Sequence, residues 1–119
     1  RTRSKRHTLA GVNTPGEGIP RTDYAPGGQN AAHTHPRAAE IMFATDGALE
    51  GDSNSTDHKL LTKTVTDGDV SGVPRGLVHF QQNRGRGPAS DIAGYNSQLQ
   101  GTQDITTTLF AGEPAVPSD

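Results

Sequence analysis

Apolar residues in this chain occur in short runs separated by turn-forming residues, and no window has the 3.6-residue apolar spacing of an amphipathic helix. Glycine, proline or Asp-Gly pairs bound most runs, which is typical of strands joined by tight turns. The strands predicted in this way are residues 18–25, 30–35, 40–45, 60–65, 77–81, 90–95 and 105–110. The polar stretch 50–59 is predicted to be a loop. This pattern predicts an all-β sandwich or barrel with little helix.

The composition fits one such domain but gives it a thin core. Leu, Ile, Val and Phe make up only about 17% of the 119 residues, although the formal net charge of −2 is too small for a typical disordered chain. The near balance of charges and the lack of a long apolar run lead us to expect no nucleic acid and no membrane as partner. Homo-oligomerisation or a bound metal is expected to supply part of the stability.

The two ends of the chain differ in character from its middle. Residues 1–10 carry four basic side chains in the first six positions and are predicted to form a basic, solvated arm. Residues 11–111 are assigned to the barrel domain, and residues 112–119, with two prolines, to a tail that leaves the core. The chain begins with Arg1 and shows no apolar signal-peptide core, so we interpret it as a processed or partial chain.

The tripeptide from His33 to His35 carries the strongest chemical signal. Side chains two positions apart on a strand share a face, so both imidazoles can reach one point. Pro36 then breaks the strand, and a new strand beginning near Glu40 can point its carboxylate into the same interior, with Met42 on the same face.

Two imidazoles and a carboxylate are a ligand set for a first-row metal that keeps open coordination positions. His79, in the strand after the rigid corner at Pro74, is a candidate fourth ligand. Copper and zinc bind such donors more tightly than manganese in free competition, so the donors alone do not select the metal. Because the imidazoles must be neutral to bind a metal, lowering the pH through the range in which histidine becomes protonated should release the metal. There is no cysteine, hence no thiolate site or disulfide.

Two spaced motifs extend this constellation. The first runs from Gly27 through His33, His35 and Glu40 to Gly47, and the second, 20 residues later, runs from Gly68 through Pro74, Gly76 and His79 to Asn83. They match the paired motifs of the cupin superfamily. The flanking segments DYAPGG (23–28), HTHPRA (33–38), PRGLVHFQ (74–81) and NSQ (96–98) resemble plant germin-like proteins, over residues 11–110.

The resemblance implies a single cupin jelly-roll β-barrel. It also implies that His33, His35, Glu40 and His79 bind Mn(2+), with water at the remaining two positions. Germin-like proteins are secreted proteins of the apoplast or cell wall that assemble as homo-oligomers, usually hexamers of paired protomers. A dimer or trimer is equally compatible with this chain.

Three functions follow from the resemblance. Superoxide dismutase activity needs only a redox metal, open coordination and protons, and we favour it. Oxalate oxidase is the alternative enzyme: Asn30 matches one of its substrate-contacting asparagines, but Pro20 replaces the other and offers no side-chain donor. A storage (nutrient reservoir) or receptor-type binding protein is the alternative of another class, although storage relatives commonly lose metal ligands.

Relatives differ from this chain within the barrel. They carry bulky apolar residues where this chain has Ser71 and Gly72, and a longer apolar strand where residues 49–52 are polar. Glycine in a strand interior destabilises it by about 1 kcal/mol relative to alanine. The disulfide segment and the terminal helices of the family are missing from this sequence, which we take as a reason to doubt the hexamer but not the metal site.

Several other residues have simpler roles. Asn54 begins an Asn-Ser-Thr glycosylation acceptor, consistent with secretion. Asn83 is expected to fix a strand end through backbone hydrogen bonds. His7 and His58 are expected to lie at the surface without a ligand role. The motif glycines Gly27, Gly47, Gly68 and Gly76 are expected to be turn residues with unusual φ.

Overall fold

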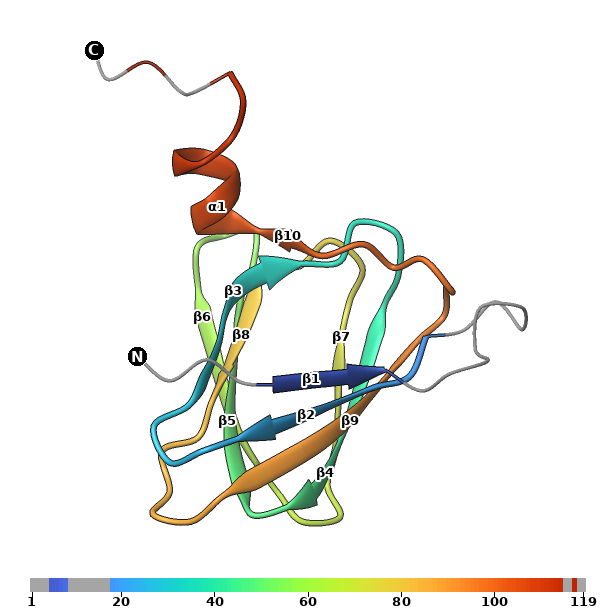
Figure 1. The fold of residues 1–119 in the computed structure, drawn as a ribbon, viewed down its shortest axis with the longest axis vertical. Coiled ribbons are helices and arrows are strands. Elements are labelled where there is room, and N and C mark those ends of the chain that lie inside the picture. Colours follow the sequence, from blue (N-terminus) through green and yellow to red (C-terminus); the bar gives the residue numbers. More distant parts are fainter. Residues whose placement is uncertain (1–4, 9–17, 115–116, 118–119) are drawn as a thin grey trace.

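Strands account for most of the regular structure in the computed structural model, which describes residues 5–8, 18–114 and 117 (Figure 1). The elements in that part of the chain are β1 (Lys5–Thr8), β2 (Pro20–Tyr24), β3 (Gln29–Thr34), β4 (Glu40–Asp46), β5 (Ala48–Asn54), β6 (Leu60–Thr66), β7 (Val70–Val73), β8 (His79–Gln82), β9 (Ala89–Tyr95), β10 (Gln103–Asp104) and α1 (Ile105–Phe110). None of the described helical segments is long and apolar enough to cross a membrane.

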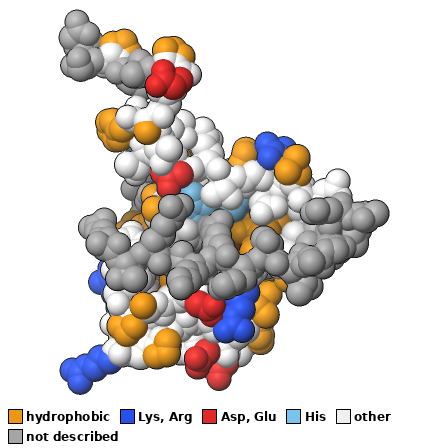
Figure 2. Space-filling view, in the orientation of Figure 1, with side chains coloured by type: hydrophobic (Ala, Val, Ile, Leu, Met, Phe, Trp, Pro, Cys, Tyr) orange, Lys and Arg blue, Asp and Glu red, His pale blue; other side chains and the backbone are white. Residues whose placement is uncertain are grey.

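The strands form two five-stranded antiparallel sheets, ordered β1-β2-β9-β4-β7 and β10-β3-β8-β5-β6. Apart from β1-β2 and β5-β6, neighbours in each sheet are not consecutive in the sequence, as in a jelly roll. The prediction of an all-β jelly-roll barrel with little helix is confirmed. On the face drawn in Figure 2, basic and acidic side chains are interspersed, in keeping with the small net charge.

Strand alternation decides which side chains enter the barrel. In β4, Glu40, Met42 and Ala44 are buried whereas Ile41 and Phe43 are exposed, as predicted for residues that share a face at every second position. The main apolar cluster consists of Tyr24, Met42, Ala44, Leu49, Val65 and Ala89. This small core leaves space in the barrel for polar groups.

The prediction of a loop over residues 50–59 is wrong for residues 50–54, which belong to strand β5. Strand β5 runs to Asn54 and pairs along its length with β6 and also with β8. A central strand gains hydrogen bonds on both edges, and this pairing outweighs the low strand propensity of Glu50 and Gly51. The chain turns only at residues 55–58, after β5 ends.

The strand predicted at residues 105–110 is instead the helix α1, none of whose residues is buried. The carboxylate of Asp104 accepts a hydrogen bond from the Thr107 N–H at 2.9 Å and so caps the first turn. An apolar side chain at both ends of this segment suggested a strand, but the capping residue before it decides the local structure.

Part of the expected N-terminal arm also belongs to a sheet. The backbone of residues 5–8 pairs with β2 as β1, so it is not a solvated tail. Residues 1–4 and 9–17 lie outside the described residues. In the predicted tail, residues 113, 114 and 117 are exposed.

The turns behave as the motif glycines predicted. Gly27, Gly47, Gly68 and Gly76 have φ values of 73°, 72°, 87° and 74°. At Gly47 a Cβ atom would also come within 2.6 Å of the Pro88 carbonyl oxygen, so the β4–β5 turn requires glycine for space as well as for conformation.

Asn83 joins three backbone segments at one end of the barrel, as predicted. Its buried side-chain Nδ2 donates to the carbonyl oxygens of Tyr24 (3.2 Å) and Gly87 (2.9 Å), and its Oδ1 accepts from the Gly85 N–H (2.9 Å). These bonds hold the end of β2 and the turn after β8 together.

We predict that Asn83→Ala lowers the free energy of unfolding by about 2–3 kcal/mol, because buried donors and acceptors lose their partners. Urea unfolding followed by circular dichroism measures this change. Asn54→Ala, at an exposed strand end, is the matched control and should change stability by less than about 0.5 kcal/mol. Equal effects of the two substitutions would contradict the anchoring role of Asn83.

Candidate metal centre

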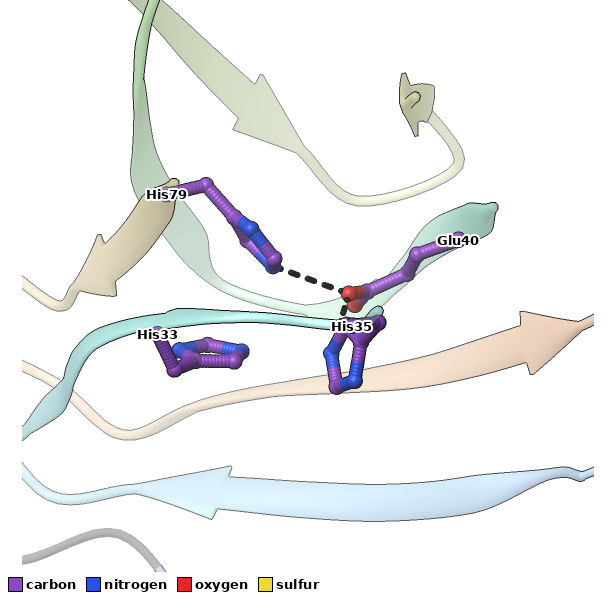
Figure 3. A group of neighbouring side chains, drawn as sticks. All are labelled: His33, His35, Glu40 and His79. Atoms are coloured by element: carbon purple, nitrogen blue, oxygen red, sulfur yellow. Dashed lines mark hydrogen bonds and ion pairs between the residues drawn. The ribbon is translucent and has the colours of Figure 1, made fainter. Parts of the chain in front are cut away.

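Four side chains converge inside the barrel from both sheets (Figure 3). His33 lies in β3 and His35 directly follows this strand; Glu40 is the first residue of β4, and His79 is the first residue of β8. Their candidate ligand atoms all lie within 4.8 Å of one another, and every one of the four residues is at most 5% exposed. The structure therefore brings together the four residues that the two motifs singled out.

Each imidazole is oriented by a hydrogen bond at Nδ1. The acceptors are the carbonyl oxygens of Ala31 for His33 (2.6 Å), Gly101 for His35 (2.6 Å) and Leu77 for His79 (2.8 Å). Because a carbonyl oxygen only accepts, Nδ1 must carry the proton in each ring. Nε2 is then the nitrogen whose lone pair each histidine offers to a metal, which is the usual arrangement of histidine ligands.

The turn after Pro36 places Glu40 at the start of its strand. Arg37 donates from its backbone N–H to the Gln100 carbonyl (3.2 Å) and from Nε to the Leu99 carbonyl (2.7 Å). The side-chain Oδ1 of Asn96 accepts from the Ala39 N–H at 3.0 Å. These bonds tie the turn to the segment after β9, and the inward face of β4 then begins with Glu40 as predicted.

The carboxylate of Glu40 lies between two of the imidazoles. Its Oε2 is 3.0 Å from Nε2 of His35 and 3.0 Å from Nε2 of His79. Burial raises the pKa of Glu40. Without metal, when Nε2 of His35 and His79 also carries a proton, hydrogen bonds from these rings, together with their charge, outweigh burial and lower the pKa from 4.5 to about 2. Glu40 is therefore an ionised acceptor at every physiological pH.

This donor set fits a metal ion. Three Nε2 atoms and a carboxylate oxygen point to one region, and among the described residues no Lys or Arg side chain forms an ion pair with Glu40. Buried electron-rich donors without a cationic side chain require a proton or a metal cation to offset their repulsion. Nitrogen and oxygen donors in this ratio suit a first-row divalent metal.

Asn30, the predicted substrate contact, lies outside the four-residue group. It faces Gln81 across the β3–β8 pair, and its Nδ2 donates to Gln81 Oε1 at 2.8 Å. Gln81 is buried and shares the inward face of β8 with His79. Asn54 lies at the exposed end of β5, and Pro20 is buried at the start of β2, in the other sheet.

Sequence reasoning missed Tyr95, whose hydroxyl oxygen lies 3.2 Å from Nε2 of His35. The ring centroids of Tyr95 and His35 are 4.6 Å apart. Tyr95 is the last residue of β9 and faces Glu40 across the β4–β9 pair. Only this long-range register places it at the centre, because the local pattern shows just another buried position of a strand.

Comparison with known proteins agrees with the motifs. The family model described as Cupin matches residues 2–119. The chain belongs to the cupin family. Among cupins, it is 63% identical over 112 residues to Germin-like protein 1-1 of Oryza sativa subsp. japonica, which covers 94% of this chain and 52% of that protein. It is 50% identical over 111 residues to Nectarin-1 of Nicotiana plumbaginifolia, covering 93% of this chain and 48% of the relative.

The chain thus spans about half the length of the curated relatives it matches. Among solved cupin structures, a recombinant oxalate oxidase in complex with glycolate superposes with a TM-score of 0.89 at 37% identity, over 96% of this chain and 61% of the other. The oxalate decarboxylase of Bacillus subtilis has a TM-score of 0.82 at 19% identity, over 89% of this chain and 29% of the other, and shows the shared fold only.

We predict that Glu40 stabilises the metal-free protein in a defined pH window. Because its pKa is lower in the folded state, the stabilisation is full above the ordinary pKa of 4.5 and is lost as pH falls toward 2. The difference in free energy of unfolding between wild type and Glu40→Gln should therefore shrink steadily as pH falls from about 5 toward 2. Urea titrations across this range measure the difference.

The matched control is Glu113→Gln, which removes an exposed carboxylate. A wild-type minus Glu40→Gln difference that stays constant down to pH 2.5 would contradict the assigned electrostatics.

Proposed function

We propose that this chain is a secreted, manganese-binding germin-like protein whose centre dismutates superoxide to dioxygen and hydrogen peroxide. The observation that carries the proposal is the set of three imidazoles, each with Nδ1 bonded to a carbonyl, that present Nε2 around the ionised Glu40. Three nitrogen donors and one oxygen donor leave two positions of an octahedral ion open for water or substrate.

Manganese is proposed from the resemblance to germin-like proteins, since the donor types also suit other first-row metals. His33, His35, Glu40 and His79 would hold the ion. When bound, the metal supplies one-electron redox chemistry, in which one superoxide is oxidised to dioxygen and another is reduced, with two protons, to hydrogen peroxide.

The protein's own groups hold the site in shape. The Nδ1 hydrogen bonds prevent the rings from rotating, and burial of the four ligands excludes bulk water from the donor atoms. The Tyr95 hydroxyl, next to His35, can donate a hydrogen bond to an oxygen bound at the centre. Such a donor would favour binding of an anion there.

Oxalate oxidase is the second candidate, favoured by the likeness to the oxalate oxidase structure at 37% identity. Asn30 has an amide near this end of the barrel, but its Nδ2 is engaged by Gln81. Pro20 offers no hydrogen-bond donor where oxalate-oxidising relatives place a second asparagine. With fewer groups to hold a dianion, we rank oxidation of oxalate below dismutation.

A storage or receptor-type binding protein is the alternative of another class. Its metal would serve structure or ligand binding, without turnover. The complete donor set supports an enzyme over a storage protein, since storage needs no open metal coordination.

Location and assembly are proposed in the same way. Asn54 is exposed at the end of β5, where a glycan could be attached, which suits a protein of the apoplast or cell wall. Ile41, Phe43, Val70 and Ile92 are exposed on neighbouring strands of one sheet. This apolar surface supports assembly into a homo-oligomer. The proposed substrate is a small molecule.

We predict that the manganese-loaded wild type turns over superoxide faster than oxalate. His79→Ala should lose both bound manganese and turnover, because a ligand is removed, whereas the matched control His58→Ala, at an exposed turn residue, should retain both. Elemental analysis after gel filtration, followed by assays of superoxide and oxalate consumption, measures these effects. Faster oxalate consumption would reverse the ranking, and stoichiometric manganese without either activity would favour the binding protein.

A further inference from the structure

A cavity of about 200 Å³ lies where the two sheets separate, between the edge strands β6 and β7. Among the described residues, β6 pairs only with β5, and β7 pairs only with β4, so no strand pairing closes the barrel wall along this line. The cavity is lined by residues of β4, β5, β6, β7 and β8. It therefore lies inside the barrel wall rather than on an outer face.

One of the four candidate metal ligands, His79, lines this cavity. His79 and Gln81 of β8 line it, and Val73, which also lines it, is the register partner of Glu40. Met42 and Ser71, another register pair, line the same space. The cavity thus borders the candidate metal centre through His79.

The cavity exists because small residues stand on its walls. Across the β5–β8 pair, Gly51 faces Gln81 and Ser53 faces His79. Ser71 of β7 faces Met42 of β4. A Cβ atom on Gly51 would point toward the Met42 Cε, 3.9 Å away, which shows that this face of β5 is directed inward. These small side chains leave room for an anion the size of superoxide or oxalate.

Lys63 supplies a positive charge at the outer end. It is the register partner of Gly51 and so lies on the inward face of β6, yet it is exposed. Its Nζ lies 3.4 Å from the Val70 carbonyl oxygen, so the side chain reaches from β6 across to β7. Asp52 also lines the cavity, but its side chain alternates to the face of β5 opposite Gly51, where its carboxylate accepts a hydrogen bond from Thr62.

We propose that this opening is the binding pocket through which small carboxylate or superoxide anions reach the metal, with Lys63 as the residue that attracts them. The inference rests on the proposed function, because the metal with Glu40 would leave a net positive charge at the inner end. A cation at each end of a partly enclosed cavity concentrates anions in it. Lys63 thus makes the cavity select negatively charged ligands over neutral ones.

The test uses manganese-loaded protein and glycolate as the probe anion, titrated by calorimetry at about 20 mM and about 200 mM salt, which change the range of electrostatic interactions. Lys63→Met should weaken glycolate binding about tenfold at low salt and much less at high salt. The control Lys59→Met removes an exposed lysine that pairs with Asp57 outside the cavity, and should change binding by less than about twofold.

A second variant tests the space itself. Ser71→Leu fills the cavity and should weaken glycolate binding at both salt concentrations, whereas Thr64→Leu, on the outward face of the edge strand β6, should not. Manganese content and circular dichroism establish that each variant is folded and loaded. Because Lys63→Met and Ser71→Leu test the proposal independently, one of them is sufficient if the other variant does not fold.

Wild-type-like glycolate binding in loaded Lys63→Met and Ser71→Leu proteins would overturn the proposal. Absence of glycolate binding by the loaded wild type would overturn it as well. Glycolate binding that depends on Lys63 and Ser71, without turnover of superoxide or oxalate, would support the pocket while contradicting the proposed enzymatic function.

Discussion

Three hydrogen bonds from imidazole Nδ1 to backbone carbonyls determine what the centre of this barrel can do. Ala31, Leu77 and Gly101 supply the acceptors, and the first two lie two residues before the histidine they orient. Once Nδ1 is committed, each ring presents Nε2 inward, toward a carboxylate that is already ionised. The charge of this buried carboxylate must be offset by protons on the rings or by a metal cation, so the fold favours cation binding here.

The barrel makes this arrangement possible by drawing ligands from both sheets. β3 and β8 belong to one sheet and carry or precede the histidines, while β4 belongs to the other and carries Glu40. The main apolar cluster is small and consists of Tyr24, Met42, Ala44, Leu49, Val65 and Ala89. The same scarcity of large side chains leaves the cavity that His79 lines, which is the opening proposed for anions.

Much of the fold and site could be predicted because it depends on local rules. The alternation of side chains along a strand predicted that His33 and His35 share a face. The end of the strand at Pro36 predicted that Glu40 begins a new strand directed into the same interior, and the motif glycines predicted turns. The rest depends on long-range pairing. Strand β5 is polar but is held on both edges, and Tyr95 reaches His35 only through the register of β9 with β4. The helix α1 depended on a single capping carboxylate at Asp104, which an apolar pattern does not reveal.

The central claim is that one metal ion is bound by Nε2 of the three histidines and by the carboxylate of Glu40. The most direct test is a crystal structure of the manganese-loaded protein, with anomalous diffraction recorded at the manganese absorption edge. The account predicts one strong anomalous peak about 2.0–2.3 Å from the three Nε2 atoms and a Glu40 oxygen, as expected for first-row metals. A peak elsewhere in the protein, or histidines rotated to coordinate through Nδ1, would contradict it.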